Sequence, residues 1–127
     1  MRIKTISAIF IGGAIGTLLR YGLNIWLTDA IVSTWLANIS GSFLLGYLSG
    51  VWMKRSTKEW LKRGLGVGLC GGFTTMSTFA FSTVQLFEQS LVTFATLYIF
   101  SSFIFGVVFA YLGLIIGMRR TQSEGSL

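Results

Sequence analysis

Several residue types that enzymes and soluble domains depend on are missing or scarce in this chain. Its 127 residues include no histidine and no proline, a single cysteine, Cys70, and only 11% charged side chains, whereas soluble domains carry about 25%. Without histidine, a Ser-His-Asp triad, a histidine-ligated zinc site and a histidine proton relay are excluded. One thiol excludes an internal disulfide and disfavours a metal site. No titratable groups are paired for acid-base chemistry, so we do not expect an enzyme.

Apolar residues take the place of the missing charge. They make up 53% of the chain, and the mean hydropathy is +0.74. Charged residues bound four apolar stretches that are long enough to cross a bilayer: about 6–26, interrupted by Arg20, then 34–53, 64–87 and 91–118. We expect the corresponding helices at about 5–27, 34–53, 61–87 and 91–118. The sequence therefore predicts an all-α integral membrane protein, with a single transmembrane domain over residues 1–127 and four transmembrane helices.

The third stretch has a centre unlike that of an ordinary membrane helix. Gly71 and Gly72 are adjacent, and six of the ten residues from 74 to 83 carry a hydroxyl group. Lipid cannot satisfy the polar groups of an opened backbone, so irregular chain at membrane depth must be buried in protein or line a polar path. We therefore predict that the third helix is broken near Gly71–Thr75, and that the break adjoins a permeation or binding site.

Other stretches carry polar residues that suit the same site. Asn38 and Ser42 share a helix face, as do Tyr98 and Ser102. The Asn38 amide could line a pore or lock two helices together, because an amide in the bilayer needs a partner. Arg20, the only charge inside a span, could reach to the interface or draw anions into a vestibule.

The basic residues are distributed very unevenly. The net charge is +6, and nine of the ten lysines and arginines lie at the chain ends or in the loop at about 54–63. With four spans, all nine lie on one side of the membrane, and the positive-inside rule places both termini in the cytoplasm. A membrane-flanking cluster explains this charge better than nucleic-acid binding does.

The acidic residues discriminate between classes of transporter. None lies inside a span, since the four are Asp29, Glu59, Glu88 and Glu124. A proton-coupled carrier normally keeps an acid within the membrane, so passive conduction through an oligomer is favoured. A small multidrug transporter has similar size but needs an acid in its first span. A non-transporting assembly protein would explain the recurring glycines but not the hydroxyl groups.

Three segments carry a family resemblance. Residues 12–16 read GGAIG and precede Arg20 and Tyr21, residues 38–43 read NISGSF, and residues 70–79 read CGGFTTMSTF. Together they resemble the Fluc (CrcB-type) fluoride channels of microbes, and the resemblance covers essentially the whole chain. The last segment is similar to the most specific family signature, a G-G-x-T-T-F-S-T-F break.

The resemblance implies an assembly and a function. It implies an antiparallel, dual-topology homodimer in the bacterial inner membrane, with two pores that let fluoride leave the cell and so give fluoride resistance. It implies a structural sodium ion at the dimer interface, bound by backbone carbonyls of Gly71 and Thr74. The pore residues implied at matching positions are Arg20, Asn38, Met76, Ser77, Thr78, Phe79, Tyr98 and Ser102.

The chain departs from the family pattern in two respects. Met76 stands where the family has the first of two phenylalanines of an aromatic box, and a thioether is polarizable but offers no ring edge. The one-sided distribution of basic residues favours a single orientation, whereas the resemblance implies two. We expect Met76 to face the pore and the dimer to be antiparallel.

Overall fold

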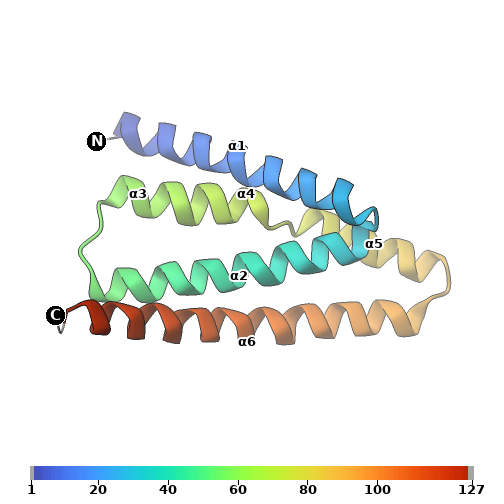
Figure 1. Cartoon of the computed structure of the whole chain (residues 1–127). Helices are drawn as coiled ribbons and strands as arrows, with labels where there is room; N and C mark the ends of the chain where they lie inside the picture. The colour runs from blue at the N-terminus through green and yellow to red at the C-terminus, as the bar shows by residue number, and fades with distance from the viewer. Residues whose placement is uncertain (1, 126–127) are drawn as a thin grey trace.

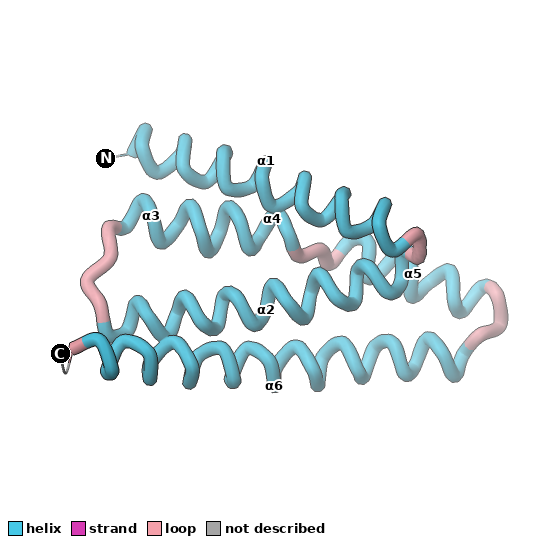
Figure 2. Tube along the Cα trace, in the orientation of Figure 1, coloured by secondary structure: helices cyan, strands magenta, loops and turns pink. Residues whose placement is uncertain are grey.

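The computed structural model describes residues 2–125, which form helices and no strand (Figures 1 and 2). The elements in chain order are α1 (Arg2–Leu27), α2 (Ala30–Lys54), α3 (Glu59–Arg63), the π-helical segment η1 (Gly64–Cys70), α4 (Gly71–Phe73), α5 (Ser77–Glu88) and α6 (Val92–Glu124). Three of them, α1, α2 and α6, are long and apolar enough to cross a membrane. The expected third span corresponds to the shorter elements from α3 to α5.

The break in this third segment lies at residues 74–76. Gly71 and Gly72 remain helical, and the helix ends only where Thr74 turns extended, with φ -82° and ψ 158°. The reason is that Gly72 serves close packing rather than opening the backbone. A Cβ atom on Gly72 would lie 2.4 Å from the carbonyl oxygen of Gly13 in α1, so no larger residue fits there.

The helices pair along their small residues. α1 packs along η1 and α4, and α2 packs along α6 (Figure 1). At Gly46 an added Cβ would lie 2.1 Å from the Ala110 carbonyl oxygen, and at Gly113 it would lie 2.2 Å from that of Phe43. Backbones that approach this closely are typical of helix association in lipid, because burying apolar surface there does not drive helices together.

A short connection reverses the chain between α1 and α2. Thr28 has φ 57°, and the carboxylate of Asp29 accepts hydrogen bonds of 2.9 Å from the backbone N–H groups of Ile31 and Val32. This capping satisfies N–H groups that the first turn of a helix leaves without partners. Asp29 therefore fixes where α2 begins.

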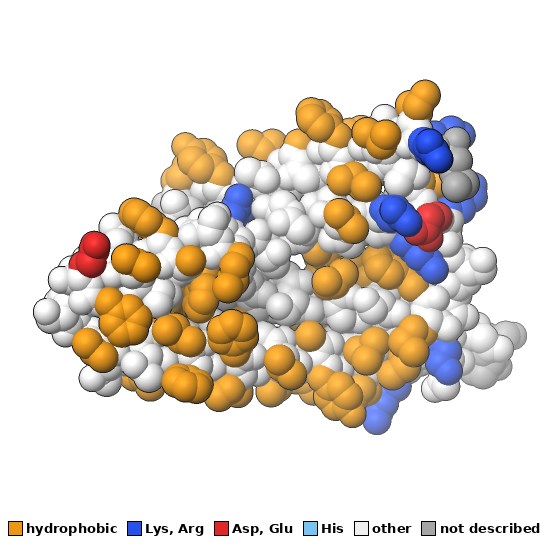
Figure 3. Space-filling model, turned by 180° about the vertical axis from the view of Figure 1, so that it is seen from behind, with side chains coloured by type: hydrophobic (Ala, Val, Ile, Leu, Met, Phe, Trp, Pro, Cys, Tyr) orange, Lys and Arg blue, Asp and Glu red, His pale blue; other side chains and the backbone are white. Residues whose placement is uncertain are grey.

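The surface divides into an apolar body and charged ends. Hydrophobic side chains cover much of the face in Figure 3, and lysines and arginines gather mainly at one end. Both chain ends and the connection between α2 and α3 lie at the same end of the bundle (Figure 1). The expected clustering of nine basic residues thus follows from the fold of the described chain.

Candidate functional site

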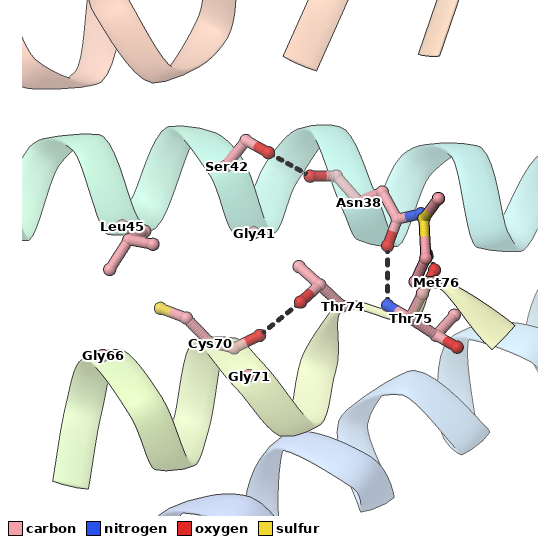
Figure 4. A pocket seen from close by; sticks show the side chains of 10 residues that line it. All are labelled: Asn38, Gly41, Ser42, Leu45, Gly66, Cys70, Gly71, Thr74, Thr75 and Met76. Atoms are coloured by element: carbon pink, nitrogen blue, oxygen red, sulfur yellow. Dashed lines mark hydrogen bonds between the residues drawn. The ribbon is translucent and has the colours of Figure 1, made fainter. Parts of the chain in front are cut away.

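The side chain of Asn38 holds the break. From the middle of α2 its Oδ1 accepts a hydrogen bond from the Thr75 N–H (2.7 Å), and its Nδ2 donates to the Thr75 carbonyl (2.9 Å) (Figure 4). The amide thus satisfies both backbone groups of a residue that has left the helix. Of the two roles the sequence allows for Asn38, the structure shows the one that locks two segments together.

The two hydrogen bonds to Thr75 use only one of the two N–H groups of the Asn38 side chain. The amide nitrogen and oxygen of Asn38 cannot be exchanged, because the Thr75 N–H needs an acceptor and its carbonyl needs a donor. A side-chain amide has two N–H groups, and only one of them is used by Thr75. Asn38 lines two pockets, so its second N–H is a candidate donor to a ligand there.

Hydroxyl groups complete the break and start the next helix. The Thr75 Oγ1 accepts a hydrogen bond from the backbone N–H of Thr78 (3.2 Å) and lies 3.3 Å from the Ser77 hydroxyl and 3.2 Å from that of Thr78. Thr75 therefore caps α5. The Thr74 hydroxyl donates to the Cys70 carbonyl (2.9 Å) and closes the preceding helix.

These diverted hydrogen bonds free two backbone carbonyls. In a continuous helix the Gly71 carbonyl would accept from the Thr75 N–H, and the Thr74 carbonyl from the Thr78 N–H. Here those N–H groups bond to Asn38 and to the Thr75 hydroxyl instead. Both carbonyls are thus left to other donors or to a cation. Residues 2–125 hold no group of three or more acidic, histidine or cysteine residues for a metal.

Two pockets open on either side of Asn38. One, of about 320 Å³, is shown in Figure 4 and is lined by Asn38, Gly41, Ser42, Leu45, Gly66, Cys70, Gly71, Thr74, Thr75 and Met76. The other, of about 360 Å³, is lined by Asn38, Ser42, Met76, Phe79, Ser102, Phe103, Gly106, Val107 and Ala110. Met76 contributes to both and is 67% exposed. The structure thus brings six of the expected residues together: Asn38, Met76, Phe79 and Ser102 in the second pocket, with Gly71 and Thr74 in the first.

Aromatic rings form part of the wall of the second pocket. The buried Phe79 ring contacts Tyr98 at a centroid distance of 5.0 Å and meets Phe103 edge to face at 6.1 Å. The Ser102 hydroxyl donates to the Tyr98 carbonyl in its own helix (2.5 Å), so its proton is not directed at the pocket. Ser102 can offer a proton to a ligand only after its hydroxyl rotates.

The hydroxyl group of Tyr98 stands out among the buried polar groups. It has no hydrogen-bond partner among the described residues, although Tyr98 is 94% buried, with a 6% exposed fraction. The hydroxyls of Thr34 in α2 and Ser82 in α5 lie beside it, close enough to interact with it, but neither forms a hydrogen bond of standard geometry with it, and both residues are buried. A buried donor without a partner is costly, so this cluster is arranged to take a further polar group.

Arg20 belongs to a third pocket, which shares no lining residue with the two beside Asn38. It lines this polar pocket, of about 210 Å³, with Thr17, Tyr21, Asn24, Ala30, Ser33, Thr34 and Thr78. Arg20 is half-buried and forms no ion pair within residues 2–125. Thr78 joins this pocket to the break, and Thr34 joins it to the Tyr98 cluster. The polar residues therefore form a connected series from Arg20 to Asn38.

Three residues of this series are not among those the sequence singles out for the site. Thr34, Thr75 and Ser82 are buried polar residues that face the break or Tyr98. A signal for Thr34 exists, since it precedes Asn38 by four residues and so shares its face. Thr75 and Ser82 belong to the hydroxyl-rich segment, but only the packing of α5 against α2 and α6 distinguishes them from Ser77, which is exposed.

Apolar helices around a polar break define a small helical membrane protein. The chain belongs to the CrcB-like family, described as Camphor Resistance (CrcB), which it matches over residues 7–114. It is 48% identical over 118 residues to the fluoride-specific ion channel FluC 2 of Bacillus subtilis, covering 91% of this chain and 89% of the relative. It is 47% identical over 119 residues to FluC 2 of Halalkalibacterium halodurans (92% and 88%) and 39% identical over 114 residues to FluC 1 of Staphylococcus epidermidis (87% and 94%). The expected family is thus confirmed.

Proposed function

We propose that this chain is a fluoride channel of the bacterial inner membrane that lets fluoride leave the cell passively. The observation that carries the proposal is the buried Tyr98 hydroxyl without a partner, beside Thr34 and Ser82, in a chain whose relatives are named fluoride-specific ion channels. Fluoride is small and strongly hydrated, so a path for it must replace water with hydrogen-bond donors. The Tyr98 O–H and the second N–H of Asn38 are such donors.

The charge distribution suits passive movement of an anion. No acidic residue lies within α1, in α2 or between Val92 and Met118 of α6, and the third segment carries acids only at its two ends, Glu59 and Glu88. No carboxylate inside a span would therefore repel an anion or exchange protons with it. Arg20 at one end of the polar series attracts anions without closing the path, because it is only half-buried. The path therefore needs no coupling ion.

We propose that two copies assemble as an antiparallel homodimer with two pores. The two pockets beside Asn38 open to the surface of the chain, and Met76 is 67% exposed next to them. A second copy packed against this face would cover Met76 and enclose the pockets. In such a pore the flexible thioether of Met76 would take the position that a phenylalanine has in the family pattern.

A structural sodium ion fits the break of this chain. The carbonyls of Gly71 and Thr74 have lost their helical donors to Asn38 and to the Thr75 hydroxyl, and the two residues line the same pocket. Hard cations prefer oxygen ligands, and the carbonyl end of a helix is its negative pole. These two carbonyls would hold the ion, which would supply a fixed positive charge at the dimer interface.

Growth in fluoride tests the function in cells. In a bacterial strain that lacks fluoride export, expression of this chain should restore growth at fluoride concentrations that otherwise stop it, because the ion would leave as fast as it enters. Chloride or acetate stress serves as the control and should be unaffected. A well-expressed, membrane-inserted chain that gives no protection would contradict the proposal.

A further inference from the structure

A separate pocket lies at the charged end of the bundle, far along α2 and α6 from the break. It measures about 220 Å³ and is lined by Tyr47 and Val51 of α2, by Arg55 directly after α2, and by Arg120, Thr121 and Glu124 of α6. None of these residues takes part in the polar series around Asn38. The pocket is polar, and it opens at the end where both chain termini lie (Figure 1).

Close helix packing fixes the walls of this pocket. An added Cβ on Gly50 would lie 2.3 Å from the Leu114 carbonyl oxygen, and one on Gly117 would lie 2.2 Å from that of Tyr47. The backbones of α2 and α6 therefore touch just inside the pocket. Since both helices are held at this contact, Arg55 and Arg120 project from fixed positions on two different elements.

The present occupant of the pocket is a carboxylate. Glu124 forms an ion pair with Arg55, and its other oxygen lies 3.9 Å from Nε of Arg120. Arg120 Nη1 also donates to the Tyr47 hydroxyl oxygen (3.0 Å), which leaves the Tyr47 proton free to donate. Two guanidinium groups thus lie against an oxyanion, with the Tyr47 phenol on the same pocket wall, which is a donor set that phosphate groups also select.

The Glu124 carboxylate is an exchangeable occupant. The side chains of Arg55, Arg120 and Glu124 are 53%, 67% and 47% exposed, respectively, and exposed ion pairs contribute little stability. Basic residues that form no ion pair within residues 2–125 lie at the same end of the bundle: Arg2, Lys4, Lys54, Lys58, Lys62 and Arg119. Their field favours a ligand with more negative charge than one carboxylate.

The position of the pocket points to the source of that ligand. α2 and α6 are both long and apolar enough to cross a membrane, and the pocket lies where their apolar stretches give way to Lys54, Arg119 and Arg120. In a membrane protein this is the level of the lipid headgroups, where basic clusters attract anionic lipids.

We propose that this pocket binds the phosphate of an anionic membrane lipid through Arg55, Arg120 and Tyr47, and that Glu124 occupies the same position when no lipid is bound. This binding site is independent of the proposed fluoride path. Glu124 acts as an internal competitor, so removing its charge strengthens lipid binding, whereas removing a guanidinium group weakens it.

Lipid retention by the purified full chain tests the site. Native mass spectrometry in detergent, with added phosphatidylglycerol or phosphatidylcholine, should show preferential binding of phosphatidylglycerol. Arg120→Gln should weaken that binding about fivefold, the contribution of one arginine near an anionic surface. Tyr47→Phe should weaken it less, and Glu124→Gln should strengthen it. Because Glu124→Gln predicts a gain, misfolding of the arginine variant cannot imitate the expected pattern.

A second ion pair at the same end supplies the matched control. Arg63 and Glu59 pair within α3 at 2.7 Å, and the hydrogen bond from Arg63 lowers the pKa of Glu59, but neither residue lines the pocket. Arg63→Gln and Glu59→Gln should leave phosphatidylglycerol binding unchanged. Equal losses in Arg63→Gln and Arg120→Gln would show diffuse charge attraction and overturn the site. Equal competition by millimolar inorganic phosphate would overturn the lipid assignment, as would weaker binding by Glu124→Gln.

Discussion

At the scale of single residues, Tyr98 is the position where a structural role and a functional role predict the most different experimental results. Its hydroxyl is buried and forms no hydrogen bond of standard geometry among the described residues, although Thr34 and Ser82 lie beside it. A buried hydroxyl in this state is explained if it donates a hydrogen bond to a ligand that the isolated chain lacks. In the proposed channel that ligand is fluoride, as the ion passes Thr34 and Ser82.

Tyr98→Phe tests this role. The change removes the oxygen and keeps the ring that contacts Phe79, so the thermal stability should be unchanged or higher, because an unsatisfied buried hydroxyl is lost. Fluoride flux should fall about tenfold, since one donor to the ion is missing. Flux measured in liposomes and melting in detergent give the two readouts. A variant that melts lower while conducting normally would show that the hydroxyl is structural.

At the scale of the elements, the break depends on side chains that replace backbone partners. Asn38 takes both hydrogen-bonding groups of Thr75, and the Thr75 hydroxyl takes the Thr78 N–H. The sequence predicts a broken helix here because its hydroxyl groups cannot face lipid. It could not predict that the helix persists through Gly71 and Gly72, because that depends on how closely α1 approaches Gly72.

Thr75→Val tests the capping of α5. Valine keeps the shape of threonine but leaves the Thr78 N–H without its acceptor, so the free energy of unfolding should fall by about 1 kcal/mol. Thr83→Val is a matched control, because the Thr83 hydroxyl bonds only to the Phe79 carbonyl of its own helix (2.8 Å), and its cost should stay within about 0.5 kcal/mol. Thermal unfolding in detergent measures both. Equal losses would mean that Thr75 does not cap the helix.

A site residue can be predicted from the sequence only where its chemistry demands a partner or a family pattern marks it. Asn38 is visible in the sequence because an amide in an apolar span demands a partner. Met76 and Phe79 are visible through the family pattern, and both line one pocket with Asn38. Thr34 and Ser82 are not visible in this way, because a hydroxyl can always bond to its own helix, and only the three-dimensional packing shows that theirs face Tyr98.

At the scale of the whole molecule, the fold gathers nine of ten basic residues at one end. For an antiparallel homodimer, half of the copies must place this end outside the cell. The spans, with Arg20 as their one internal charge, impose little orientation of their own, whereas the basic end favours one. The charge distribution therefore predicts one orientation in the membrane, whereas the family resemblance predicts two.

Accessibility of a terminal tag in intact cells tests the antiparallel arrangement. We predict that an impermeant reagent labels about half of the copies tagged at the C-terminus, since each dimer would expose one C-terminus on each side. A single-orientation membrane protein of known topology gives the control values. Labelling of none or of all copies would rule out an antiparallel homodimer of this chain.

Fluoride efflux from liposomes that contain only the purified protein tests the central claim most directly. A fluoride electrode should record rapid release when a membrane potential is relieved, and a chloride electrode should record none from matched chloride-loaded liposomes. The Met76→Phe variant, which restores the family residue, should also conduct fluoride. Folded protein that releases no fluoride in either form, or that releases chloride equally well, would contradict the assignment of this chain as a fluoride channel.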